Sequence, residues 1–131
     1  MRVTLAWIVG IGLAVNGLTM LAAPLAWYGA VPGVPDTGPF NPHFVRDIGC
    51  AYEVAGAALI WFAAIPAARP AAQAGAAFLA LHALVHLWDF AARREPLHHL
   101  LADLPTVFLA PALAIWIAWP GRDLHKETGH A

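Results

Sequence analysis

The stretch AAQAGAAFLALHALVHLWDFAA, residues 71–92, decides the class of fold. It is 22 residues long, and Asp89 is its only formally charged side chain. A helix that crosses a hydrocarbon core of roughly 30 Å needs about 20 residues. The stretch therefore predicts a transmembrane helix, and this helix carries two histidines and an aspartate toward its end.

Three more apolar blocks accompany it. Residues 3–23 and 104–119 hold no charged residue, and residues 48–65 hold only Glu53. We predict an all-α integral membrane protein, an antiparallel up-down-up-down four-helix bundle, with helices near residues 3–27, 42–65, 71–93 and 98–119. The chain is expected to form a single transmembrane domain, 1–131, in which residues 120–131 are a polar C-terminal tail.

The composition excludes several classes of protein. Hydrophobic residues make up 60% of the chain, charged residues make up 11%, and the net charge is −1, so no basic surface for nucleic acid is expected. The single cysteine, Cys50, rules out an internal disulfide and a paired-cysteine metal motif. The first block is longer than a usual signal core and is expected to be retained as a helix. The lipid bilayer is the predicted partner, and a homo-oligomer or a membrane-protein partner stays open.

The connections predict the topology. They are short, so neighbouring helices should be antiparallel. The second helix should start with Asn41 as N-cap and Pro42 at its first position. Basic residues are slightly more numerous on the side of the two termini, which predicts a multi-pass protein of the inner (plasma) membrane with both termini in the cytoplasm. Trp27, Trp116 and Trp119 are expected at the membrane interfaces.

Polar residues should gather on one membrane face. His82, His86 and Asp89 follow i, i+4, i+7 spacing and share one face of a helix. The topology brings the start of the second helix, the end of the third and the start of the fourth to the same membrane face. That face would hold His43, Arg46, Asp47, His86, Asp89, His98, His99 and Asp103. Glu53 and His82 lie about 10 Å deeper by helical rise. We therefore predict a polar funnel that closes at these two residues, with Glu53 facing the bundle, either neutral or paired with Arg46 or His82.

The first functional hypothesis is a ligand pocket that faces away from the cytoplasm. His82 and His86 would bind a divalent transition metal or a small polar ligand, and Asp47, Asp89 or Asp103 would complete the site. Imidazole and carboxylate ligands suit zinc or non-haem iron. Whether catalysis follows is open, because no HExxH motif or other catalytic signature is present.

Two alternatives use the same residues. Buried Glu and His side chains mark proton paths in membranes, so Glu53, Arg46 and His43 could belong to a proton or ion relay. In the other alternative the protein is an accessory or scaffold subunit and the polar residues are structural. Asp89 would then cap its helix or pair with Arg93, and Asp103 would cap the fourth helix ahead of Pro105.

Two motifs carry a resemblance to known proteins. At NPHFVRDIG, residues 41–49, and HALVHLWD, residues 82–89, the chain resembles a group of short four-helix bacterial membrane proteins. This group is broadly similar to DoxX-like and related domain-of-unknown-function families. The resemblance implies the four-helix membrane architecture and no particular activity.

Overall fold

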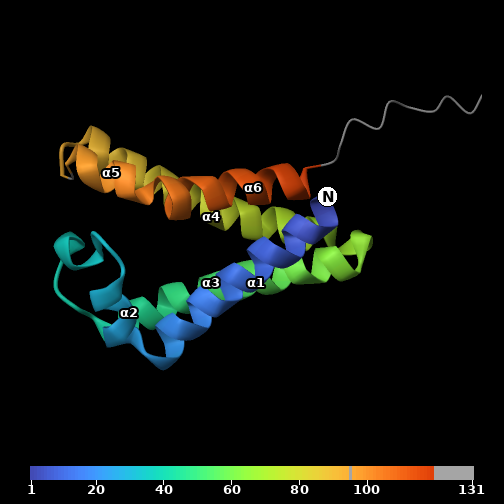
Figure 1. The fold of residues 1–131 in the computed structure, drawn as a ribbon, viewed down its shortest axis with the longest axis horizontal. Coiled ribbons are helices and arrows are strands. Elements are labelled where there is room, and N and C mark those ends of the chain that lie inside the picture. The colour runs from blue at the N-terminus through green and yellow to red at the C-terminus, as the bar shows by residue number, and fades with distance from the viewer. Residues whose placement is uncertain (95, 120–131) are drawn as a thin grey trace, which may run out of the picture.

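The computed structural model describes residues 1–94 and 96–119. The elements run in the order α1 (Arg2–Ala22), α2 (Pro24–Ala30), η1 (Val34–Thr37), α3 (Pro42–Ala64), η2 (Pro66–Ala68), α4 (Arg69–Ala91), α5 (Leu97–Asp103), η3 (Leu104–Phe108) and α6 (Leu109–Ala118) (Figure 1). Every regular element within the described ranges is helical, which confirms the all-α prediction.

Four segments are long and apolar enough to cross a membrane: Arg2–Ala22, Pro42–Ala64, Pro66–Ala91 and Leu97–Ala118. They are 21, 23, 26 and 22 residues long, and each exceeds the length that a bilayer core requires. The four segments pack as a bundle with contacts between adjacent helices, as expected. The chain is therefore a small multi-span membrane protein.

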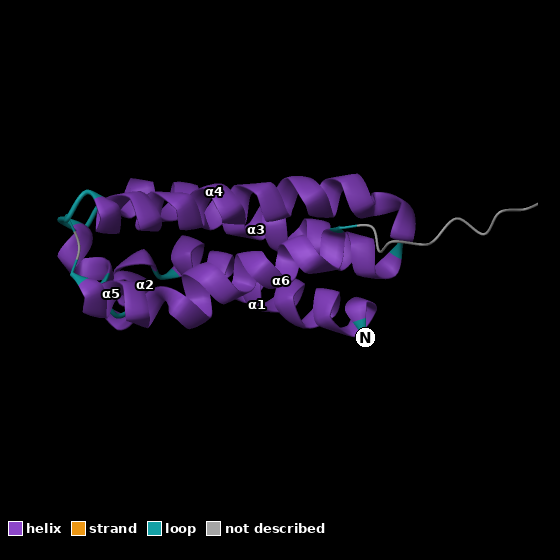
Figure 2. Cartoon of the chain, turned by 90° about the horizontal axis from the view of Figure 1, so that it is seen from above, coloured by secondary structure: helices purple, strands orange, loops and turns teal. Residues whose placement is uncertain are grey.

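The two ends of the bundle differ. At one end, the Arg2 guanidinium donates to the Trp119 carbonyl over 3.1 Å, and the Gln73 side chain donates to the Ala118 carbonyl over 3.4 Å. We call this the terminal end. The opposite end, here the α5 end, holds α2, η1 and α5 (Figures 1 and 2). These two contacts place the described start of the chain, the end of α6 and the α3–α4 turn close together.

Glycine sets the closest helix contact, between α1 and α3. A Cβ atom added to Gly56 would lie 2.7 Å from both the Gly10 carbonyl oxygen and the Ala14 nitrogen. A Cβ atom added to Gly17 would lie 2.7 Å from the Gly49 carbonyl oxygen. Small residues let helix backbones approach in lipid, where little hydrophobic force drives association. These four glycines therefore fix the rotation of α3 against α1.

The remaining core is built from aliphatic side chains and alanine. Leu13, Leu59, Leu79 and Ile117 come from α1, α3, α4 and α6, and each is at least nine-tenths buried. On α4, Ala72, Ala76 and Ala83 are buried, and Gly75 lies against Ala55 of α3. One apolar core therefore joins all four spans.

The first span is shorter than predicted. We expected a helix to about residue 27, whereas α1 ends at Ala22 and a separate helix, α2, starts at Pro24. Ala23, which precedes the proline, has φ −136° and ψ 58°, outside the helical region. The ring of a proline disfavours helical geometry in the preceding residue, which accounts for the break.

The fourth span, Leu97–Ala118, is a continuous run of helix that changes its winding along its length. Pro96 stands as the N-cap of α5, and the π-helical segment η3 connects α5 to α6. At Pro105 the chain lacks a backbone N–H, and the Leu109 N–H donates to the Leu104 carbonyl five residues earlier. The wider turn places Asp103 inside a continuous helical span and not at its start.

Candidate histidine–carboxylate site

The central polar contact joins α4 to α5. His86 Nδ1 lies 2.8 Å from Asp103 Oδ2, so the ring N–H donates to the carboxylate. The two side chains are only 21% and 16% exposed. The expectation that Asp103 caps the fourth helix is wrong, because the residue ends α5 and makes no capping bond. Asp103 instead holds the imidazole of a neighbouring span.

Aromatic contacts extend this pair into the bundle. The rings of His82 and His86 have centroids 4.9 Å apart, as their spacing of one helical turn allows. The His82 ring also stacks on Phe78 at 6.1 Å and meets Tyr52 of α3 edge-on at 5.9 Å. We call Tyr52, Phe78, His82, His86 and Asp103 the histidine cluster. Three helices contribute to it: α3, α4 and α5.

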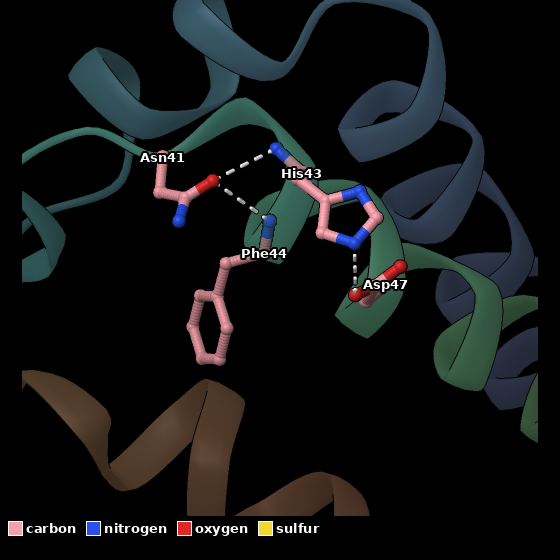
Figure 3. A network of polar contacts seen from close by, with 4 residues as sticks. All are labelled: Asn41, His43, Phe44 and Asp47. Atoms are coloured by element: carbon pink, nitrogen blue, oxygen red, sulfur yellow. Dashed lines mark hydrogen bonds and ion pairs between the residues drawn. The ribbon is translucent and has the colours of Figure 1, made fainter.

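Asp89 and Asp47 lie outside the histidine cluster. The Arg94 guanidinium donates to Asp89 Oδ1 over 2.9 Å, so Asp89 pairs with Arg94 and not with Arg93. Asp47 Oδ2 lies 3.3 Å from His43 Nε2 one turn earlier on α3, and both side chains are more than half exposed (Figure 3). The Asn41 side chain caps the same helix by accepting from the His43 and Phe44 backbone N–H groups, as predicted.

Glu53 and Arg46 occupy the α1 side of α3. The Glu53 Cγ would lie 3.1 Å from a Cβ atom on Gly17, so its side chain is directed at α1. Its Oε1 atom is buried and has no hydrogen-bond partner. Arg46 is exposed, and its Nε donates to the Leu21 carbonyl over 3.3 Å. Pairing of Glu53 with Arg46 or His82, one of the two alternatives that we predicted, is therefore not present.

The polar residues form separate groups and not the single funnel that we predicted. Tyr52 and Glu53 are neighbours in sequence and point about 100° apart on an α-helix. Tyr52 meets α4, whereas Glu53 meets α1. The rotation of α3 sends one residue to each interface, and the glycine contacts that fix this rotation are not visible in the spacing of the charges.

The structure adds contacts that the sequence did not predict. His99 Nε2 lies 3.2 Å from Asp36 Oδ2, which ties the η1 segment to α5. Trp27 Nε1 donates to the Asn16 side chain over 2.9 Å and so holds α2 against α1. Tyr52 is the residue whose absence from the predicted site matters most. Tyr52 carries a hydroxyl group in the middle of an apolar span, and this feature of the sequence could have identified it as a site residue.

No group of three or more His, Cys, Asp or Glu side chains within residues 1–94 and 96–119 is arranged to hold a metal ion. Comparisons with protein-family models, with curated proteins and with solved structures found no match to this chain. The four apolar spans agree with the four-helix membrane architecture that the resemblance implies.

Proposed function

We propose that the histidine cluster conducts protons between the α5 end of the bundle and the middle of the bilayer. The observation that carries the proposal is the row of titratable groups, from Asp103 through His86 and His82 to Tyr52. Each neighbouring pair along this row is in hydrogen-bond or ring contact. Ionisable residues inside membrane spans are costly, and chains of them mark proton relays.

The depth of these residues supports the proposal. His86 and His82 lie five and nine residues before the end of α4 at Ala91. At about 1.5 Å per residue they reach depths of about 8 and 13 Å, and Tyr52, ten residues into α3, reaches about 15 Å. Half of a typical hydrocarbon core is about 15 Å, so the row runs from near one face to the midplane. Such a half-path suits a relay subunit that exchanges protons with a partner or ligand. Glu53, at a similar depth on the α1 side, is a separate candidate proton acceptor.

Metal binding is the second candidate function. A metal-ligating histidine usually donates its other ring N–H to a carboxylate, and the contact between His86 and Asp103 has this form. Zinc or non-haem iron could bind His82 and His86, with the remaining positions filled by water or by a partner. Asp47 and Asp89 would first have to leave their ion pairs with His43 and Arg94.

Nuclear magnetic resonance of ¹⁵N-histidine-labelled protein in lipid nanodiscs tests the relay. If protons reach His82 through His86, the His86→Ala change should slow proton exchange at the His82 ring. His98→Ala is the matched control, because His98 is exposed and lies outside the histidine cluster. Unchanged exchange at His82 in the His86→Ala protein contradicts the relay.

Metal analysis tests the second candidate function, metal binding. Stoichiometric zinc or iron in protein purified without chelator, lost in both His82→Ala and His86→Ala, would favour the metal site. If neither exchange at His82 nor bound metal depends on these residues, the structural role of an accessory subunit remains.

A further inference from the structure

An open groove lies between α2 and the start of α3. The groove is shallow, and the open space above its lining is about 560 Å³. Six of the seven lining residues are apolar, and Arg46 is the only charged one; the lining consists of Ala23, Pro24, Leu25, Ala26, Phe40, Pro42 and Arg46. The groove therefore combines an apolar floor with one cation.

Arg46 retains hydrogen-bonding capacity. Its Nε donates to the Leu21 carbonyl, one of the last carbonyls of α1, which orients the guanidinium. No carboxylate among the described residues lies within ion-pair distance of it. The neighbouring Asp47 is 3.3 Å from His43 (Figure 3). The exposed Arg46 side chain therefore has donors left for an external anion.

The position of the groove matches the boundary between lipid headgroups and acyl chains. Arg46 stands four residues after Pro42, the first residue of α3, which is about 6 Å along the helix. The lining of α2 is apolar, and Leu25 is 64% exposed, a composition suited to contact with lipid. An apolar hollow at this depth, with a cation beside it, complements an amphiphile that carries a negative charge.

We propose that the groove binds one anionic phospholipid. The phosphate accepts hydrogen bonds from the Arg46 guanidinium, whose planar N–H groups match phosphate oxygens in pairs. One acyl chain lies along the apolar residues of α2 and the start of α3. A free phosphate would leave this apolar surface uncovered, so the lipid is the occupant that uses both parts of the site. The proposal does not depend on the proton relay.

Native mass spectrometry of delipidated protein with added phosphatidylglycerol tests the site. We expect one retained lipid on the wild-type chain and about tenfold weaker retention in Arg46→Gln, because a hydrogen bond to a charged group is lost. Arg93→Gln is the matched control, since Arg93 is an exposed arginine at the same end of the bundle and does not line the groove. Equal retention by wild type and Arg46→Gln, or an equal loss in Arg93→Gln, overturns the proposal.

Two further experiments test the apolar lining and the cation of the groove separately. Ala26→Trp should fill the groove and reduce retention while circular dichroism shows an unchanged helix content; undiminished retention overturns the acyl-chain contact. Glycerol 1-phosphate should fail to displace the lipid, and phosphatidylcholine should bind more weakly. Displacement by the soluble phosphate overturns the groove as a lipid site, and equal binding of phosphatidylcholine overturns its preference for anionic lipid.

Discussion

The hydrogen bond between the His86 imidazole and the Asp103 carboxylate joins α4 to α5, and most of the surface of both side chains is covered. Its two residues are 17 apart in sequence and lie on different helices. Removing one partner of such a pair leaves the other with its desolvation penalty and no compensating bond. The stability of the bundle should therefore depend on both residues together.

We predict that His86→Ala and Asp103→Asn each lower the free energy of unfolding by about 1–3 kcal/mol. The double variant should lose less than the sum of the two, because the interaction can be lost only once. Unfolding in mixed detergent micelles, followed by circular dichroism, measures these values. His98→Ala, which removes an exposed histidine next to His99, should change stability little. Additive losses in the double variant would show that the two side chains do not interact.

A second residue-scale prediction concerns Trp27. Its Nε1 donates to Asn16 across the break between α1 and α2. Trp27→Phe keeps an aromatic ring and removes this donor, so we expect a loss of about 1 kcal/mol in the same unfolding measurement. Trp61→Phe is the control, because Trp61 is 54% exposed and makes no side-chain hydrogen bond within the described residues. Similar losses in the two variants would contradict a specific bond to Asn16.

At the scale of elements, the α1–α3 crossing is the helix contact that is most sensitive to an added side-chain atom. A methyl group on Gly56 would meet backbone atoms of Gly10 and Ala14 at 2.7 Å, and backbone cannot move aside as a side-chain tip can. We expect Gly56→Ala to destabilise the bundle by about 1–3 kcal/mol.

Gly12 provides the control for this crossing. It lies in α1, and a Cβ atom there would meet nothing within 4 Å. Gly12→Ala should be neutral or stabilising, since alanine favours helix by up to about 1 kcal/mol over glycine. Both values come from unfolding in mixed micelles, and a larger loss at Gly12 than at Gly56 would refute the proposed packing.

The sequence predicted the four spans because block length and the Asn41–Pro42 start signal depend on local chemistry. It did not predict the break at Ala23 within the expected first helix, or the π-helical turn after Asp103. It also did not predict which polar residues would meet, because the rotation of each helix depends on contacts such as those of Gly17 and Gly49. A one-residue difference in that rotation decides whether Tyr52 or Glu53 faces α4.

At the scale of the whole molecule, the arrangement of the four spans predicts which connections share a membrane face. The contact of Arg2 with Trp119 places the start of α1 beside the end of α6. The contact of His99 with Asp36 joins the α1–α3 connection to the start of the fourth span. Positive charge further predicts that the terminal end lies in the cytoplasm.

Cysteine labelling with a membrane-impermeant maleimide checks this topology in a Cys50→Ala background. Thr37→Cys and Arg94→Cys should label from one side of the membrane, and Ala67→Cys should label from the other; all three positions are exposed. Labelling of Thr37→Cys and Ala67→Cys from the same side would contradict the up-down order. Labelling of Ala67→Cys from outside intact cells would reverse the orientation and leave the number of spans unchanged.

The contact between α4 and α5 and the proposed relay both depend on the pair of His86 and Asp103, and ¹⁵N resonances of the histidine rings report on this pair most directly. In wild-type protein in lipid nanodiscs, the Asp103 carboxylate, 2.8 Å away, should determine the ¹⁵N chemical shift of His86 Nδ1. We predict that Asp103→Asn shifts this resonance and leaves those of His43 and His98 in place. An unshifted His86 resonance, or equal shifts at His43 and His98, would contradict a partly buried histidine–carboxylate pair between α4 and α5.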